Sequence, residues 1–280
     1  MDQTIPQQLD QEADRIVRDI GIPPCPAILT KLLTEMRSDE PDYNKASKLI
    51  GGDVSLAAAM LKTVNSPFFG LRTKATTVQQ SLHLLGLRNT VEIVTGLLLR
   101  QAFPIGDSAA MEYFWEASSG IAEVTAQLAR PLGFSNRDEA YTFALFRDCG
   151  IALMIAKFPG YANFMKMSHL DNGRPITSDE VDEFGMDHAS LGARLAQSWA
   201  LPEEIHQAIL FHHEYQRLQD GSIPEPIARL VALVLAAEWL YTTHNIGPRC
   251  REWTRGSGFA LEVLEMTEEE LLGIGEKIDH

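Results

Sequence analysis

Four side chains in the second half of the sequence stand out as possible metal ligands. They are one carboxylate, Asp148, and three imidazoles, His188, His212 and His213. Asp148 interrupts the apolar spacing of YTFALFRDCGIALM, while His188 and His213 share helical faces with leucine and isoleucine residues. Imidazole and carboxylate are the ligands of hydrolytic metal sites. Inward-facing groups from three helices could therefore converge on one ion.

The same residues also fit a site without chemistry. A carboxylate on an apolar face is costly to bury unless a partner is present. Asp148 could accept hydrogen bonds from one or two of the histidines, or from Arg147 beside it. A histidine on an apolar face more often belongs to such a buried polar network than to a metal site. The residue types alone leave both interpretations open.

Composition excludes several classes of function. The chain has 280 residues, of which 45% are hydrophobic and 22% charged, as in a folded globular protein. Its net charge of −14 argues against nucleic acid as the main partner, because nucleic-acid binding needs cations. Cys25, Cys149 and Cys250 form no CxxC motif, which fits a reducing cytoplasm. The apolar run IARLVALVLAAEWLY contains Arg229 and Glu238 and is too short to cross a bilayer, so we expect a buried helix and no membrane partner.

The elements that must position these residues are helices. Apolar residues recur at three- and four-residue spacing along the chain, and capping residues such as Asp42, Asp53 and Thr77 precede several of these segments. No alternating run makes a convincing strand. The sequence therefore predicts an all-α fold. Two long helices, over residues 138–157 and 202–215, would carry Asp148 and the adjacent histidines.

A break in the pattern divides the chain into two parts. Pro104 to Asp107 combine proline, glycine and aspartate between two helical segments, which is typical of a loop. We expect residues 1–105 to form an N-terminal helical lobe and residues 106–280 a second helical lobe with a C-terminal extension. The loop is too short to act as a free tether, so the sequence predicts that both lobes pack into one body.

The first lobe resembles a known family. The segments IPPCPAILTKLLTEM and ASKLIGGDVSLAAAMLKTVNSPFFGLRTKATTVQQSLHLLGL resemble the HDOD domain, a module of bacterial signalling proteins. The matching features are a P-x-x-P entry, a D-x-x-L-x-A-x-x-L-K helix, the N-S-P-F-F-G turn and the S-L-H-L-L-G-L segment. The resemblance extends from about Ile22 to beyond Tyr215. It implies an all-α domain whose C-terminal lobe resembles HD-type helical domains.

The resemblance also implies a degenerate site. HDOD domains are similar to HD-type metal phosphohydrolases and to HD-GYP cyclic-dinucleotide phosphodiesterases, whose adjacent His-Asp pair corresponds here to Arg147-Asp148. Ser118 stands where an earlier histidine is expected, and the late aspartate would fall near Ala237-Glu238. His188 and His212-His213 match further HD-GYP histidines, but the G-Y-P signature after HHE is missing. The resemblance thus implies a vestigial site of Ser118, Arg147, Asp148, His188, His212 and His213.

Arg147 decides between the functions that this site suggests. A guanidinium has no acceptor lone pair and stays protonated, so it cannot bind a metal ion. We expect a non-enzymatic, cytoplasmic regulatory module that acts through protein–protein interaction with signalling proteins. It would have no catalytic residue, no cofactor and no metal, with room for a small ligand in the residual pocket. The alternative is an HD-type metal-dependent phosphohydrolase, for a cyclic dinucleotide or a nucleotide, with the reduced ligand set Asp148, His188, His212 and His213.

Overall fold

The computed structural model describes residues 22–66, 69, 71, 73–103, 108–134, 137–167, 173–245 and 250–278. Across these residues the chain forms helices and no β-strand, which confirms the all-α prediction. The helices have these bounds: α2 Ala27–Met36, α3 Tyr43–Gly51, α4 Val54–Val64, α5 Val78–Leu85, α6 Leu87–Ala102, α7 Ala109–Ala129, α8 Arg137–Phe146, α9 Cys149–Lys157, α10 Tyr161–Met167, α11 Ile176–Phe184, α12 His188–Ser198, α13 Glu203–Phe211, α14 Tyr215–Gln219, α15 Glu225–Asn245, α16 Arg251–Val263 and α17 Glu268–Ile278.

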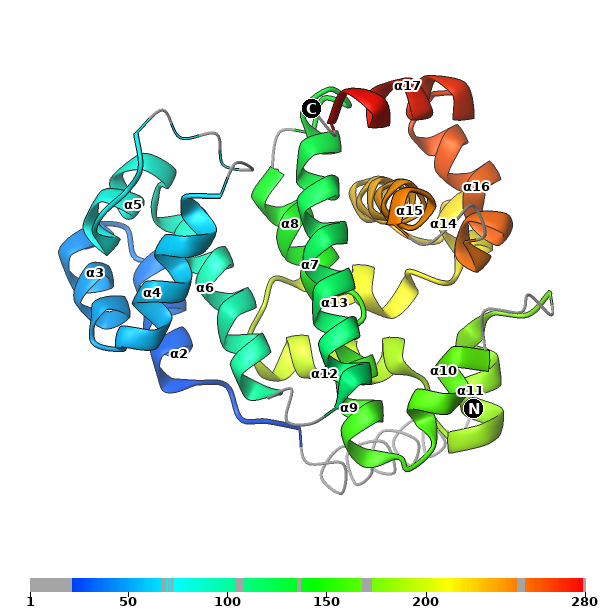
Figure 1. Ribbon diagram of the computed structural model, residues 1–280, viewed down its shortest axis with the longest axis horizontal. Coiled ribbons are helices and arrows are strands. Elements are labelled where there is room, and N and C mark those ends of the chain that lie inside the picture. The colour runs from blue at the N-terminus through cyan, green and yellow to red at the C-terminus, as the bar shows by residue number, and fades with distance from the viewer. Residues whose placement is uncertain are drawn as a thin grey trace, which may run out of the picture.

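The helices gather into two lobes, as predicted (Figure 1). Helices α2 to α6 form the N-terminal lobe, and helices α7 to α17 form the C-terminal lobe. Helix α6 packs on α2 and α4 within its own lobe and on α8 of the other lobe. One apolar core includes buried residues of both lobes. The predicted boundary, at residues 104–107, lies outside the described residues, so its position stays a prediction.

The helix starts follow the local signals of the sequence. The side chains of Asp42, Asp53 and Thr77 each accept a hydrogen bond from a backbone N–H in the first turn of α3, α4 and α5. Gly86 separates α5 from α6 with a φ of 83°, a conformation that glycine adopts without strain. These contacts satisfy backbone donors that a helix start leaves unpaired. Local chemistry therefore fixes where these helices of the N-terminal lobe begin.

Helix α15 forms the centre of the C-terminal lobe. It packs against α7, α13 and α16, which surround it in Figure 1. The helix has 21 residues, so the expectation that its apolar run is too short to cross a membrane is wrong. Among the described helices of at least 18 residues, it alone is long and apolar enough to do so, yet 61% of its apolar window is buried inside the protein. The expected burial is confirmed, and α15 is a core helix.

Two helices expected to be continuous are broken. The segment over residues 138–157 divides into α8 and α9, with Arg147 and Asp148 in the turn between them. The turn directs α9 against α12 so closely that a Cβ on Gly150 would lie 1.9 Å from the backbone oxygen of His188. Likewise α13 ends at Phe211, and the two adjacent histidines follow in a turn. The candidate ligands thus lie at helix ends and not along helix faces.

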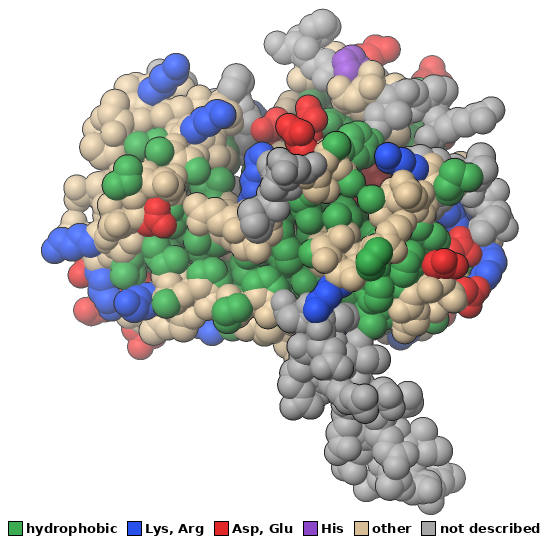
Figure 2. All heavy atoms as spheres, turned by 60° about the horizontal axis from the view of Figure 1, so that its bottom comes forward, with side chains coloured by type: hydrophobic (Ala, Val, Ile, Leu, Met, Phe, Trp, Pro, Cys, Tyr) green, Lys and Arg blue, Asp and Glu red, His purple; other side chains and the backbone are tan. Residues whose placement is uncertain are grey.

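Figure 2 shows one face of the whole molecule. Hydrophobic side chains form a broad area across its middle, and charged side chains lie mainly toward the edges. Among the exposed large hydrophobic residues are Tyr113 on α7 and Met167 at the end of α10. Both helices border the cavity described below.

Candidate metal centre

The structure brings together the four residues that the sequence analysis named as alternative metal ligands. Asp148 lies in the turn before α9, His188 begins α12, and His212 and His213 follow α13. One ligand atom from each lies within 4.8 Å of all the others. The Nε2 atom of His188 is 3.3 Å from Nε2 of His212 and 3.1 Å from Nε2 of His213. Asp148 Oδ1 is 3.2 Å from His212 Nε2 and 3.5 Å from His188 Nε2.

Two of the histidines are held from behind by buried carboxylates. His188 Nδ1 lies 2.7 Å from Oε2 of Glu180, and His213 Nδ1 lies 2.8 Å from Oε2 of Glu252. Since a carboxylate can only accept, both Nδ1 atoms carry the hydrogen and donate it. A carboxylate behind the imidazole is the usual arrangement around metal-bound histidines.

The third histidine is held by the backbone. His212 Nδ1 donates to the carbonyl oxygen of Ile209 at 2.6 Å. All three rings therefore use Nδ1 to fix their orientation and turn Nε2 toward the cluster. Burial lowers the pKa of His212 to about 3, assisted by the neighbouring His213, so its Nε2 is an unprotonated acceptor at neutral pH.

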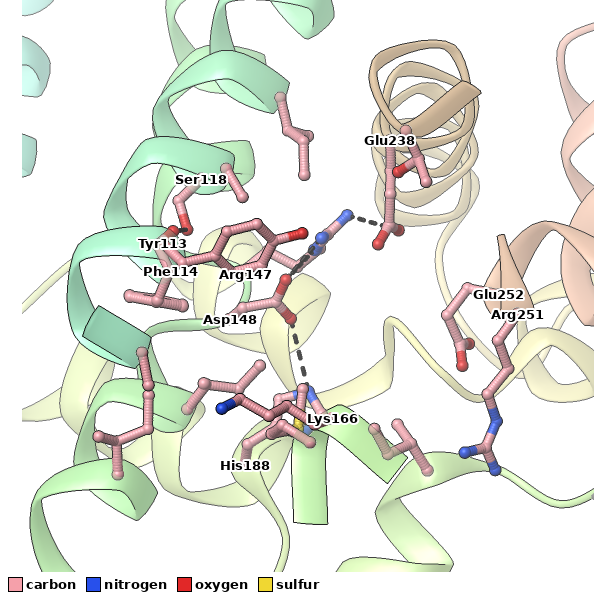
Figure 3. A pocket seen from close by; sticks show the side chains of 18 of the residues that line it. Tyr113, Phe114, Ser118, Arg147, Asp148, Lys166, His188, Glu238, Arg251 and Glu252 are labelled. Atoms are coloured by element: carbon pink, nitrogen blue, oxygen red, sulfur yellow. Dashed lines mark hydrogen bonds and ion pairs between the residues drawn. The ribbon is translucent and has the colours of Figure 1, made fainter. Parts of the chain in front are cut away.

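Arg147 binds the other side of the same carboxylate. Its Nη2 and Nε atoms donate to Asp148 Oδ2 at 2.5 and 2.9 Å, and its Nη1 atom donates to Glu238 Oε2 on α15 at 3.0 Å (Figure 3). Of the partners considered for Asp148, the structure places Arg147, His188 and His212 beside it. His213 makes no direct contact with Asp148. The expectation that Asp148 lies among apolar residues of a helix is wrong. Its side chain is 20% exposed and lies at a helix break beside a cavity.

Opposite charges offset the cost of burying these groups. Burial disfavours ionised Asp148, but Arg147 and the protonated His188 outweigh it and hold the pKa of Asp148 well below its usual range. Burial also disfavours charged His188, yet Glu180 and Asp148 raise its pKa well above the ordinary value. Without an ion, His188 therefore carries a proton on Nε2. A metal ion at this position would replace that proton.

The residues fit one metal ion and do not fit two. Three imidazole nitrogens and one carboxylate oxygen are a suitable donor set for a single transition-metal ion. A second ion would need Asp148 Oδ2, which Arg147 occupies, and would lie against a fixed cation. Ser118 adds no ligand to the cluster, because its hydroxyl donates to the Phe114 carbonyl within α7 at 2.8 Å. Ser118 is buried and lines only the cavity.

A cavity of about 360 Å³ gives access to the centre. Its walls are mainly apolar side chains of α7, α9 and α10, and its polar lining includes Asp148, His188 and Glu238. Two basic residues, Lys166 and Arg251, lie elsewhere in the lining (Figure 3). The cavity is large enough for a small organic ligand.

The sequence analysis missed the residues that support the histidines. Glu180, Glu252, Tyr161 and Tyr215 are all buried, and none was named as a site residue. One signal was available for Glu180, since it stands four residues after the buried Ile176 and shares its helical face. Helix α16, which carries Glu252, was not predicted. Its apolar residues Trp253, Phe259 and Ala260 lie on one buried face, so a signal was available, although charged residues and two glycines stand between them.

The fold defines an all-α helical domain, and comparison with known proteins agrees with it. The HDOD domain family model matches residues 22–215, more than half of the chain. The chain therefore belongs to the HDOD domain family.

The proteins of similar structure include one named as a phosphohydrolase and one named as a signal transduction protein. A candidate phosphohydrolase from Shewanella amazonensis superposes with a TM-score of 0.69 at 21% identity, covering 94% of this chain and 92% of that one. A candidate signal transduction protein from Marinobacter aquaeolei has a TM-score of 0.69 at 18% identity, covering 93% of this chain and 57% of that one. An uncharacterized Treponema pallidum protein is 25% identical over 209 residues, which are 72% of this chain and 39% of the relative. The chain thus spans well under half of that relative's length, and the two structural likenesses show the fold alone.

Proposed function

We propose that the chain is a non-hydrolytic regulatory module of cytoplasmic signalling that acts through contacts with other proteins. Its centre accommodates one ion and not the pair that a dinuclear phosphohydrolase needs. The observation that carries this proposal is the position of Arg147. Its guanidinium is buried and joins Asp148, in the turn before α9, to Glu238 on the central helix α15.

Electrostatics support this reading of Arg147. Burial disfavours its charge, but Asp148 and Glu238 outweigh that effect and raise the pKa of Arg147 further, so the guanidinium stays charged. A like charge at about 4 Å is repelled by roughly 4 kcal/mol per unit charge at an effective dielectric constant near 20. A divalent ion at the far side of Asp148 would meet this repulsion without a free carboxylate oxygen to offset it.

A second function has a specific observation in its favour. The four converging ligand atoms could hold one ion, and the cavity beside them has room for a small substrate. A bound ion would supply Lewis-acid polarisation and a more acidic water. Lys166 and Arg251 in the cavity lining carry the charge that a phosphate would need. Because the relatives are named both as phosphohydrolase and as signalling protein, their names favour neither function.

Metal content and turnover test the proposal together. Untagged protein would be loaded with Zn²⁺, Mn²⁺ or Fe²⁺, freed of loosely bound ions and analysed by mass spectrometry for metals. The same samples would be assayed with bis(4-nitrophenyl) phosphate and with a cyclic dinucleotide. We expect at most one ion per chain and no metal-dependent turnover. Two ions per chain, or turnover that disappears in Asp148→Ala but persists in the exposed-site control Asp39→Ala, would overturn the proposal.

A further inference from the structure

A buried glutamate connects the first histidine of the centre to a tyrosine. Oε2 of Glu180 accepts hydrogen bonds from the backbone N and from Nδ1 of His188, at 2.9 and 2.7 Å. Oε1 of Glu180 accepts from the hydroxyl of Tyr161. Glu180 and Tyr161 are completely buried, and His188 is 1% exposed.

A second glutamate connects another histidine to a tyrosine in the same way. Oε2 of Glu252 accepts from His213 Nδ1 at 2.8 Å and from the hydroxyl of Tyr215 at 2.7 Å. Arg255 on the same helix adds a longer hydrogen bond at 3.3 Å. Two Tyr–Glu–His chains from separate helices thus end in the same cluster.

The two chains have a common end point. Nε2 of His188 and Nε2 of His213, the last atoms of the two chains, are 3.1 Å apart. Two ring nitrogens at this distance need a proton or a metal ion between their lone pairs, because two bare acceptors repel. Burying two carboxylates is expensive, and a structural role would not require both to end at one point. The proton on Nε2 of His188 can join only one such pair, whereas one ion would take the Nε2 lone pairs of His188, His212 and His213 together and so account for the cost and the convergence.

We propose that Glu180 and Glu252 are positioning residues of a single-ion metal centre formed by Asp148, His188, His212 and His213. They fix the Nδ1–H form of the two rings and aim both Nε2 atoms at the ion. This inference rests on the single-ion centre of the proposed function and adds the residues that build it.

The donor set defines the chemical class of the ion. Three imidazole nitrogens with one carboxylate oxygen favour Zn²⁺, Fe²⁺, Co²⁺ or Ni²⁺, whereas Mg²⁺ and Ca²⁺ take oxygen ligands. A carboxylate hydrogen-bonded to Nδ1 makes the opposite nitrogen a stronger donor. His188 and His213 have this support, and His212 has only the carbonyl of Ile209. The glutamates therefore strengthen the preference for a nitrogen-seeking ion.

Zinc affinity of single variants tests the role of the glutamates. Untagged protein stripped with a chelator would be titrated with Zn²⁺ in competition with a chromophoric chelator. We expect the variants Glu180→Gln and Glu252→Gln to bind Zn²⁺ about ten-fold or more weakly than wild type. Two exposed glutamates on the same helices, Glu183 on α11 and Glu262 on α16, offer matched Glu→Gln controls that should leave the affinity unchanged. A large excess of Mg²⁺ should not displace Zn²⁺.

Further measurements separate a positioning role from a general effect on folding. Circular dichroism and thermal unfolding of the metal-free variants show whether the fold persists, and the visible spectrum of bound Co²⁺ reports the ligand geometry. Tyr161→Phe and Tyr215→Phe keep both glutamates and should weaken Zn²⁺ binding only a few-fold. If the glutamine variants do not fold, these tyrosine variants decide, and unchanged affinity in both overturns the inference.

The outcomes for the inference and for the proposed function differ. Wild-type protein that fails to bind one Zn²⁺ per chain overturns the inference but not the proposed function, which allows at most one ion and is overturned by two ions or by metal-dependent turnover. If wild-type protein binds Zn²⁺ and the folded variants Glu180→Gln and Glu252→Gln bind it with the same affinity, the inference alone is overturned. Binding weakened in these variants, with an altered Co²⁺ spectrum and unchanged controls, supports it.

Discussion

Replacing Arg147 with methionine should destabilise the protein more than the same replacement of a surface arginine. Methionine keeps most of the length and apolar contact of the side chain but removes the charge. Glu238 would then lose its ion-pair partner, and Asp148 would keep only the protonated His188, since Arg147 is the cation between the two carboxylates. Breaking a buried ion pair by removing one partner typically costs about 3–5 kcal/mol. The two carboxylates are 20% and 21% exposed, which places the expected loss near the lower end, at about 3 kcal/mol.

This loss should depend on pH. Burial raises the pKa of Glu238, and Arg147 opposes that rise. Without Arg147 the pKa of Glu238 would rise further above its ordinary value of about 4.3. The folded variant would then bind a proton that the unfolded chain releases, so its stability falls as pH rises from about 4.3 through the folded pKa. We therefore expect the deficit of Arg147→Met to be larger at pH 8 than at pH 5.5.

Denaturant unfolding followed by circular dichroism measures both effects. A loss of about 3 kcal/mol corresponds to a fall in Tm of about 6–12 °C in a domain of this size class. Arg88 offers a matched control, because it also bridges two carboxylates, Glu92 and Glu139, but its side chain is 57% exposed. Arg88→Met should cost at most about 1 kcal/mol. An Arg147→Met protein as stable as Arg88→Met, or with no pH-dependent deficit, would refute the reasoning.

Three further changes test other parts of the structure. Asp148→Ala should lower the free energy of unfolding by about 1–3 kcal/mol, measured by denaturant titration, while leaving any phosphoesterase background unchanged. Gly150→Ala should destabilise the protein by about 1–3 kcal/mol, because the new Cβ would meet the His188 backbone oxygen, whereas Gly258→Ala on α16 meets no atom within 4 Å and should be neutral or stabilising in thermal unfolding. Trp199→Phe should cost about 1 kcal/mol by the same assay, because it removes the buried indole hydrogen bond to the carbonyl that precedes α2; stability equal to wild type would contradict this.

The range of the interactions explains why the helix starts were predictable and the helix breaks were not. Caps such as Asp42 and Asp53 act within one turn, so the sequence contains the whole signal. The break at Arg147 and Asp148 depends on the close approach of Gly150 to α12, which is a contact between distant segments. The apolar spacing continues across the break and therefore predicted one helix. Helix α16 was missed for another reason: its buried face carries Trp253, Phe259 and Ala260, but charged residues and glycines separate these apolar positions.

The site shows the same limit. Asp148 and the three histidines could be predicted because ionisable residues on apolar patterns are conspicuous. Glu180 lies in ITSDEVDEF among other acidic residues, so it resembles part of a solvated face, yet it is completely buried. Apart from Ile176 one turn earlier, only the contact with His188 distinguishes Glu180 from its exposed neighbours. A supporting carboxylate is identified by the group that it holds, and that partner becomes visible only in three dimensions.

The guanidinium of Arg147 has one property that no bound ion shares. It belongs to the chain, so its occupancy between α15 and the turn before α9 does not depend on any concentration in the surroundings. Chelators cannot extract it, and scarcity of metals cannot deplete it. An ion held by the neighbouring histidines would instead exchange with the solution. The side of Asp148 that faces Arg147 is therefore permanently occupied, and any response to ion supply has to come from the side that faces the histidines.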